Sequence, residues 1–288
     1  MITRHEAYPE LSKALQVNPL LFKREDLHPY GSHKGRSIPV MIDKYLEEGI
    51  KSFAISSSGN AALAAAFHAS KLNSKRTDKI NLEILVGQRI SRKKLAKLEQ
   101  FRNQYIKVTM HDRPLQTLFN IIKDPQVRGL RQSTDDASLL GYRELAKELE
   151  EIKNLEAVFI GTSSGTTAQA LLQNFTKKVE VHIVQTSSCH TMSDDFIDYE
   201  ITDEQSIADA IVDQGSIRKN ILIPLVKESR GTGWIASNEQ IRDAQALVKN
   251  HTGLDISTNS ALSVAGLMQA VYTGKTWNGS VVCMICGD

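Results

Sequence analysis

The sequence predicts an α/β fold with largely parallel sheets covered by helices. Apolar runs typical of buried strands alternate with segments of helical periodicity along almost the whole chain. Such alternation favours parallel sheets, because the connection between two parallel strands is usually a helix. The 288 residues, 41% of them hydrophobic, are enough for one large or two modest domains.

The expected elements follow one another as strand and helix pairs. The first strand covers residues 20–22 and leads, through a turn at Pro29 and Gly31, into a helix near Lys34. Three further pairs are expected at residues 51–55 with 61–72, 82–86 with 91–101, and 106–110 with 115–122. Beyond Asp135 the pattern predicts a helix to residue 152, a strand at 157–160, a helix at 166–175 and a strand at 179–184. Finally, a helix at 238–250 precedes the apolar strand V-V-C-M-I-C, which ends at Cys286.

Charge and hydropathy argue against several classes of partner. A formal net charge of +2, without long runs of one sign, gives no electrostatic case for binding nucleic acid or an anionic membrane. No run approaches the ~18 apolar residues of a membrane span, and the first residues lack the charged-then-apolar pattern of a signal peptide. A cytoplasmic protein is therefore expected.

The three cysteines, Cys189, Cys283 and Cys286, do not suggest a disulfide framework. Cys283 and Cys286 form a C-x-x-C pair within the last expected strand. An offset of three residues points side chains to opposite faces of a strand. The sequence therefore predicts no shared metal there.

Lys34 stands in the segment F-K-R-E-D-L-H-P-Y-G-S-H-K-G-R, residues 22–36, just after a turn and just before a helix. A lysine at such a junction, with an apolar strand leading in, can lose water in a cleft and become a nucleophile. Taken alone, it is more simply one of 35 lysines and arginines in solvent. Other motifs of the chain decide between these interpretations.

Two loops that open helices suit anions. S-S-S-G-N-A-A at residues 56–62 follows a strand, and free amides at a helix N-terminus accept an anion, although a serine or asparagine there could simply cap the helix. G-T-S-S-G-T-T-A at residues 161–168 also follows a strand, and its amides and hydroxyls suit a phosphate. It matches neither the P-loop nor the G-x-G-x-x-G dinucleotide pattern.

These segments together resemble the pyridoxal-phosphate enzymes of the tryptophan synthase β type, a family that includes threonine synthase, cysteine synthase and the serine/threonine dehydratases. K-R-E-D-L with G-S-H-K is similar to the tryptophan synthase β version. P-Y-G-S-x-K-G-R, S-S-S-G-N and S-I-A-D-A-I at residues 206–211 are closer to threonine synthase. The acidic loop that tryptophan synthase uses in place of S-G-N is absent.

The resemblance implies a pyridoxal 5'-phosphate cofactor and a role for each motif. Lys34 is expected to carry the cofactor covalently and to remove the α-proton of the substrate. Ser57, Ser58 and Gly59 are expected to bind the substrate carboxylate, and Asn60 to contact the phenolic oxygen of the cofactor. The expected phosphate loop consists of Gly161, Thr162, Ser163, Ser164, Gly165 and Thr166. Two of these, Ser163 and Ser164, stand where family members often carry glycines.

The end of the last strand is expected to face the pyridine nitrogen of the cofactor. Family members carry a hydroxyl there, whereas this chain has Cys286 followed by Gly287. A thiol is a weak donor, so the nitrogen is expected to stay unprotonated. Ser260, in the helix start S-T-N-S-A, is the alternative, because cysteine synthases use a serine of that segment.

The resemblance also implies two open, largely parallel twisted sheets, with a smaller domain inserted into a larger one and the cofactor in the cleft between them. Residues 1–36 and 131–288 would form the cofactor-binding domain, and residues 37–130 the substrate-binding domain. The implied reaction is β- or γ-elimination or replacement on a small amino acid substrate, most like threonine synthase. Serine/threonine dehydratase and a non-catalytic relative are the alternatives. Because dimers are common in the family, a homodimer remains open.

Overall fold

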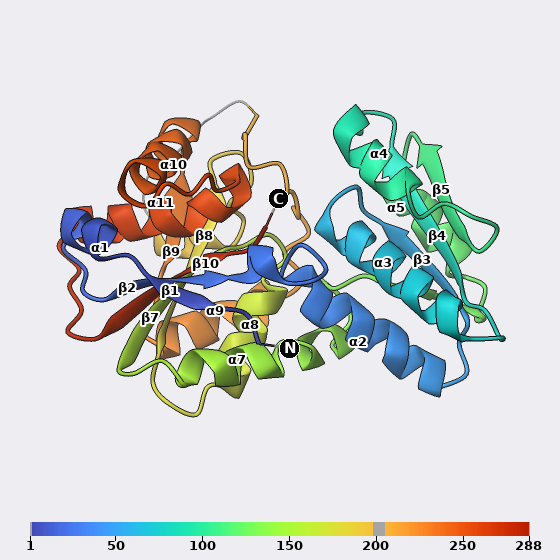
Figure 1. The fold of residues 1–288 in the computed structure, drawn as a ribbon, viewed down its shortest axis with the longest axis horizontal. Coiled ribbons are helices and arrows are strands. Elements are labelled where there is room, and N and C mark those ends of the chain that lie inside the picture. The colour runs from blue at the N-terminus through green and yellow to red at the C-terminus, as the bar shows by residue number, and fades with distance from the viewer. Residues whose placement is uncertain (1, 198–204, 288) are drawn as a thin grey trace. The chain divides into compact units, whose positions relative to one another are not determined.

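The computed structural model describes residues 2–197 and 205–287 (Figure 1). It confirms the α/β class, with one sheet of six strands and one of four. The chain divides into two compact units. The larger contains Met1–His28 and Tyr142–Asp288, and the smaller contains Pro29–Gly141.

The sheet of the larger unit has the strand order β1-β2-β10-β7-β8-β9. Its strands are β1 His5–Ala7, β2 Leu20–Arg24, β7 Leu155–Gly161, β8 Glu180–Thr186, β9 Gly233–Ala236 and β10 Ser280–Ile285. All neighbours are parallel except β1, which runs antiparallel to β2. Every residue of β10 is buried, as expected of a strand that has neighbours on both edges and helices over both faces.

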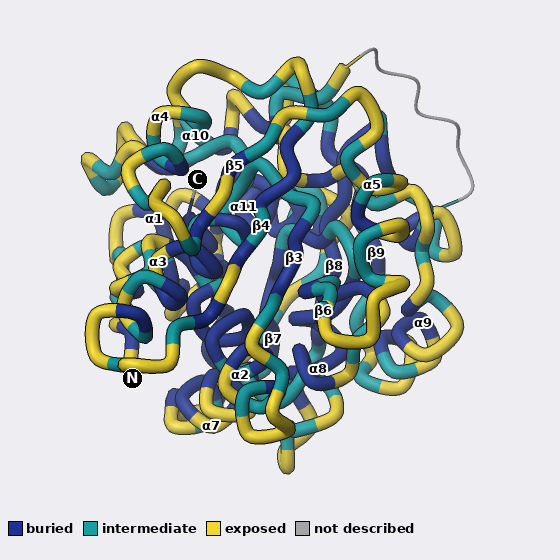
Figure 2. The backbone as a smooth tube through the Cα atoms, turned by 90° about the vertical axis from the view of Figure 1, so that its right-hand side faces the viewer, coloured by how far each residue is buried: buried dark blue, intermediate teal, exposed yellow. Residues whose placement is uncertain are grey.

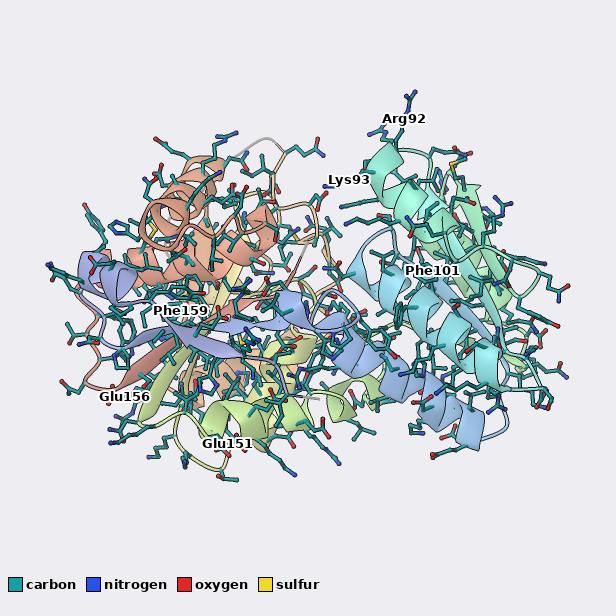
Figure 3. All side chains as sticks on the ribbon, viewed as in Figure 1. Arg92, Lys93, Phe101, Glu151, Glu156 and Phe159 are labelled. Atoms are coloured by element: carbon teal, nitrogen blue, oxygen red, sulfur yellow. The ribbon has the colours of Figure 1, made fainter. Side chains whose placement is uncertain are left out.

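Helices cover both faces of this sheet. They are α1 Pro9–Leu15, α7 Arg143–Glu150, α8 Thr166–Asn174, α9 Lys219–Glu228, α10 Asn238–Thr252 and α11 Thr258–Tyr272. In Figure 1, α1, α10 and α11 lie on one side of the sheet and α7, α8 and α9 on the other. A core of apolar residues from α1, α10 and α11 packs on strand residues such as Phe22 and Phe159. In Figure 3, Phe159 lies inside this unit, whereas Glu151 and Glu156 lie towards its periphery.

The sheet of the smaller unit is fully parallel, in the order β5-β4-β3-β6. Its strands are β3 Ser52–Ser56, β4 Asn81–Gly87, β5 Ile106–His111 and β6 Val127–Gly129. Its helices are α2 Lys34–Glu47, α3 Asn60–Lys75, α4 Arg92–Glu99, α5 Pro114–Ile121 and α6 Ala137–Leu140. In Figure 2, β3 and β4 are buried along much of their length, whereas the edge strand β6 is not.

The alternation of side chains along β3 separates two cores in this unit. Phe53 and Ile55 pack with residues of α2, α3 and α4, whereas Ala54 packs with Leu118 of α5 on the opposite face. The basic residues Arg92 and Lys93 at the start of α4 are exposed and extend away from the ribbon in Figure 3. Within the described residues no helix is long and apolar enough to cross a bilayer.

One helix expected beyond Asp135 is in fact two, α6 and α7, separated at Gly141 and Tyr142. A Cβ atom at Gly141 would lie 2.1 Å from the carbonyl oxygen of Arg36. The backbone between α6 and α7 therefore passes so close to the start of α2 that only glycine fits at this position. This position is also where the chain leaves the smaller unit. Because α2 packs against α3 and α6, Lys34 is grouped with the smaller unit, which extends beyond the expected limits of 37 and 130.

Candidate functional site

The K-R-E-D-L segment forms a buried network inside the larger unit. Lys23 is fully buried, pairs with the carboxylate of Glu148 and donates to the carbonyl oxygen of Thr3 at 2.8 Å. The hydroxyl of Thr3 donates to Glu25, which is also fully buried. A buried charge is tolerated when it is paired and hydrogen-bonded in this way.

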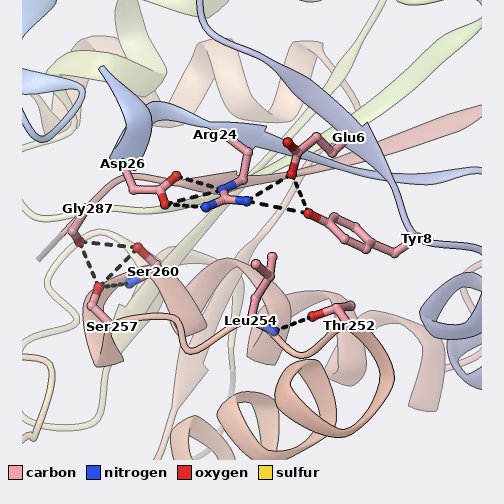
Figure 4. Close-up of polar contacts among 9 residues, drawn as sticks. All are labelled: Glu6, Tyr8, Arg24, Asp26, Thr252, Leu254, Ser257, Ser260 and Gly287. Carbon is pink, nitrogen blue, oxygen red and sulfur yellow. Dashed lines mark hydrogen bonds and ion pairs between the residues drawn. The ribbon is translucent and has the colours of Figure 1, made fainter. Parts of the chain in front are cut away.

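Arg24 and Asp26 of the same segment belong to a second set of polar contacts, which Figure 4 shows. The Arg24 guanidinium donates to both carboxylate oxygens of Asp26 and to Glu6. The hydroxyl of Tyr8 donates to Glu6, and burial together with this contact raises the pKa of Tyr8 to about 12. The same hydrogen bond from Tyr8, with the charge of Arg24, lowers the pKa of Glu6. The segment therefore fixes the end of β2, from which the chain runs towards Lys34.

Lys34 is the first residue of α2 and is partly buried. Its amide donates to the hydroxyl oxygen of the fully buried Ser32. The loop before it is tied to α3 by Tyr30, whose ring packs edge-on against Phe67 with centroids 4.7 Å apart. The loop just before Lys34 is thus held in place by contacts of its own residues.

A relay of three side chains joins this loop to both helices, and sequence patterns gave no signal for it. The Tyr30 hydroxyl lies 2.9 Å from Nδ1 of His68, and Nε2 of His68 lies 2.7 Å from Asp43. Burial, with the nearby Asp43 charge, raises the pKa of Tyr30, so the phenol keeps its proton. A carboxylate can only accept, so Nε2 of His68 is the donor of its contact with Asp43.

The loop from Ser57 to Gly59 follows β3 and opens α3. Gly59 is the N-cap residue, and no side chain caps the helix. The Gly59 amide donates to the hydroxyl oxygen of Ser57 at 3.3 Å. The capping interpretation of this motif is therefore wrong at α3, in contrast to α4 and α11, whose N-termini are capped by Ser91 and Ser257. First-turn amides have no acceptor within a helix, so this N-terminus suits an anion.

The loop that starts at Gly161, the last residue of β7, opens α8 in the same manner. Gly165 is the N-cap in the left-handed region, with φ 78°, and no side chain caps the helix. The amide of Thr162 donates to the Val184 carbonyl, and its hydroxyl donates to Ile160. The first turn of α8 carries no acidic residue. This donor set fits the phosphate of a cofactor, because amides at the positive end of the helix face no competing negative charge in that turn.

The two serines of this loop differ in their contacts. The hydroxyl of Ser164 lies 2.9 Å from that of Thr166, at the start of α8. The Ser163 oxygen instead accepts the amides of Val212 and Asp213, at 3.1 and 3.2 Å. Ser163 therefore holds a distant segment of the chain and has only its own proton left to donate.

That distant segment contains S-I-A-D-A-I, and it connects the phosphate-loop residue Ser163 to the start of α11. The amide of Ala210 donates to the side chain of Asn259 at 3.0 Å, and the hydroxyl of Thr258 donates to the carbonyl of Ile207. The motif thus braces the loops at the carboxyl ends of the strands. Its sequence gave no indication of this role.

The end of β10 is fixed by the hydroxyls of Ser257 and Ser260, as Figure 4 shows. They lie 2.7 and 3.2 Å from the carbonyl oxygen of Gly287. Ser257 also accepts the amide of Ser260 and so caps α11. Cys286, next to this clamp, is buried. Ser260 is therefore engaged with the backbone beside Cys286.

Cys283, the other half of the C-x-x-C pair, is completely buried, and its thiol donates to the Ser263 carbonyl at 3.5 Å. Burial raises the pKa of this thiol. A buried neutral thiol of this kind is unreactive. Within residues 2–197 and 205–287, no group of three or more metal-ligating side chains is found.

The structure thus groups the candidate residues in two sets. In the larger unit β10 pairs with β7, so the loop from Gly161 to Thr166 and the residues Ser260 and Cys286 all lie at the carboxyl ends of neighbouring parallel strands. In the smaller unit, Lys34 starts α2, and Ser57, Ser58, Gly59 and Asn60 connect β3 to α3. Loops at the carboxyl ends of parallel strands are where open α/β folds bind ligands.

This arrangement defines an α/β scaffold with two helix N-termini that suit anions and a lysine at the start of a helix. Residues 2–287 match the family described as pyridoxal-phosphate dependent enzyme. The chain belongs to this family, and its cofactor is pyridoxal phosphate.

Similar proteins agree with this assignment. The chain is 24% identical to a threonine synthase of Bacillus sp. (strain ULM1), over 96% of this chain and 80% of that protein. It is 23% identical to a threonine synthase of Mycobacterium bovis, over 92% and 75% of the two chains. Its fold resembles that of a pyridoxal 5'-phosphate-dependent aspartate racemase, with a TM-score of 0.80 and 20% identity over 100% of this chain and 90% of the other. Threonine deaminase isoform 2 from Solanum lycopersicum gives a TM-score of 0.80 with 19% identity, over 99% and 78%.

Proposed function

We propose that the protein catalyses β- or γ-elimination or replacement on an amino acid and that its reaction is most like that of threonine synthase. The observation that carries this proposal is the pair of helices, α3 and α8, that each begin after a glycine with no side-chain cap. One such N-terminus suits a substrate carboxylate and the other a cofactor phosphate. The curated relatives named threonine synthase support the particular reaction.

Lys34 has the central role in this proposal. Pyridoxal phosphate, when bound, withdraws electrons from the α-carbon of an amino acid. The Nζ atom of Lys34 would hold the cofactor covalently and would remove the proton from the α-carbon of the substrate. The fixed loop of Tyr30 and Ser32 supports this role, because it limits the positions that Lys34 can take.

The remaining residues hold the two anions and the ring. The phosphate is bound by the amides at the start of α8 and by the hydroxyls of the loop from Gly161 to Thr166. The substrate carboxylate is bound by Ser57, Ser58 and the amides from Gly59 onward, while Asn60 contacts the phenolic oxygen.

Cys286 is the proposed neighbour of the pyridine nitrogen. Its thiol is a weak donor, so Cys286 would not protonate the nitrogen of a bound cofactor. Such a partner would favour elimination or replacement at the β- or γ-carbon of the substrate. The Ser257 and Ser260 clamp on Gly287 supports this assignment, because it directs the Ser260 hydroxyl to the backbone.

Deamination of serine or threonine is the second candidate. It needs one anion site for substrate, whereas conversion of O-phosphohomoserine to threonine needs a further site for the phosphate. Among the described helices of the smaller unit, α3 is the one whose N-cap is a glycine. A glycine lets an anion approach the helix amides closely, so this one glycine N-cap is the observation that favours the simpler reaction.

A substrate panel tests the proposal. The protein loaded with pyridoxal phosphate is incubated with O-phosphohomoserine, O-acetylserine, serine with and without indole, and threonine, and phosphate and keto acid are measured. Phosphate release with threonine formation is the expected result. Formation of keto acid from serine or threonine would instead support the second candidate, deamination. Cofactor binding without turnover of any member would contradict both and favour a non-catalytic relative.

A further inference from the structure

The smaller unit contains a pocket of about 310 Å³ that none of the sites above uses. It lies between α5 and the edge strand β6, together with the loop that follows β6. One wall is apolar and is formed by Leu118, Ile122 and Val127. These residues belong to the small core on the α5 face of the sheet.

Arg131 lines the same pocket. The residue is partly buried, and its guanidinium stacks over the ring of Phe119, 5.3 Å from the centroid. In the part of the chain that the structure describes, it has neither an ion pair nor a hydrogen-bond acceptor. Nearby Arg128 differs, because it donates to the Tyr45 hydroxyl at 2.7 Å and pairs with Asp135. A partly buried cation held in place by an aromatic ring is suited to bind an anion.

The edge of β6 adds a second donor. The amide of Leu130 donates to Ala54 of β3, so the alternation of the backbone points the amide of Gly129 away from β3. Since β6 is the edge strand of this sheet, no strand of the described residues pairs with that amide. Gly129 also lines the pocket. A planar group with two oxygens can therefore meet a backbone amide and a guanidinium.

Two acidic residues line the pocket, and their positions limit what it accepts. The carboxylate of Asp135 is occupied by the Tyr45 hydroxyl, the amide of Ala137 and Arg128. Asp136 is exposed to solvent. Two acidic side chains in the lining disfavour a ligand with many negative charges, whereas a single carboxylate can bind to Arg131.

We propose that this pocket binds a small organic acid, with one carboxylate on Arg131 and an apolar body against Leu118, Ile122 and Val127. The carboxylate matches the planar fork of the guanidinium. β6 has three residues, which is too short an edge for an extended peptide to pair along. The ligand is therefore a small molecule, either a simple carboxylic acid or an amino acid with an apolar side chain.

Calorimetric titration of the full chain loaded with pyridoxal phosphate tests this inference, with 3-phenylpropionate as the probe. This acid lacks the amino group that a substrate of the proposed reaction carries. Saturable binding is expected, and Arg131→Gln should weaken it about tenfold to a hundredfold, as loss of a charge-assisted contact does. Arg102→Gln is the matched control, because Arg102 is an exposed arginine of the same unit, paired with Glu99. It should leave the affinity unchanged.

Further probes separate charge from shape. 3-Phenylpropionamide has the same body without the charge and should bind at least tenfold more weakly. Phenylalanine as a second probe shows whether the pocket prefers an amino acid or a simple carboxylic acid. Binding that depends on Arg131 supports the inference with either ligand. Thr134→Trp fills the pocket from an exposed lining position and should abolish binding even if Arg131→Gln proves unstable. Equal binding of the acid and the amide, or unchanged binding by the Arg131 and Thr134 variants, would overturn the proposal.

Discussion

Gly165 offers the sharpest test of the proposed phosphate loop. Its φ of 78° lies in the left-handed region, and a Cβ atom would lie 2.6 Å from Cδ2 of Leu222 and 3.2 Å from the sulfur of Met192. The left-handed conformation costs a residue with a side chain about 1–2 kcal/mol. Overpacking adds about 1–3 kcal/mol, at the lower end here because Leu222 and Met192 present flexible side-chain ends. Gly165→Ala should therefore destabilise the cofactor-free protein by about 2–4 kcal/mol.

The pair Gly165→Asn and Gly165→Asp separates charge from strain, since the two side chains have the same size. A carboxylate about 6 Å from a phosphate dianion costs about 1.4 kcal/mol in a water-like dielectric and several times more in a partly buried site. Gly165→Asp should thus bind pyridoxal phosphate at least tenfold more weakly than Gly165→Asn.

Urea or thermal unfolding of the cofactor-free variants measures the strain, and fluorescence titration with pyridoxal phosphate measures affinity. A carboxylate at a helix N-terminus slightly stabilises the helix, so Gly165→Asp should be no less stable than Gly165→Asn without cofactor. If the two variants bind the cofactor equally well, the loop does not hold the phosphate and the reasoning fails.

Three further predictions concern the remaining candidate residues. Borohydride reduction of the loaded protein should fix the cofactor to Lys34. Lys34→Ala should abolish the covalent labelling, whereas the control Lys44→Ala should not. Labelling of another lysine in the wild-type protein would contradict the assignment. Cys286→Ser should keep most of the kcat, because a hydroxyl is also an uncharged partner for the ring nitrogen. Ser260→Ala should lower stability through the lost contact to Gly287 but keep most of the kcat. Loss of kcat in Ser260→Ala, with none in Cys286→Ser, would make Ser260 the residue at the ring nitrogen. Burial lowers the pKa of His182, which stacks on a phenylalanine ring, so below about pH 6.5 the unfolded state takes up a proton that the folded state does not, and stability is lost as the pH falls. The free energy of unfolding, measured from pH 8 to 5, should fall with a steeper slope than in His182→Gln, and equal slopes would refute this.

Much of the smaller unit could be predicted because its signals are local. The helix expected at residues 61–72 is α3 Asn60–Lys75, and the strand expected at 82–86 is β4 Asn81–Gly87. Both signals, apolar periodicity and a glycine at the start of a helix, are carried by residues that stand close together in the sequence. Short elements such as β6 Val127–Gly129 carry too few residues for a period to show. α9 Lys219–Glu228 contains Pro224, which argues against a helix in a local reading.

The same distinction between local and long-range information applies to the candidate site. The sequence by itself determined which loops follow strands and open helices, because the glycines and hydroxyls of S-S-S-G-N and G-T-S-S-G-T-T stand side by side in the chain. Only the tertiary structure decided how those groups are used. It engages Ser163 with the amides of Val212 and Asp213, directs Ser260 to Gly287, and places Arg131 over the ring of Phe119. Such contacts join residues far apart in the sequence, and a hydrogen bond depends on distances that no local pattern records.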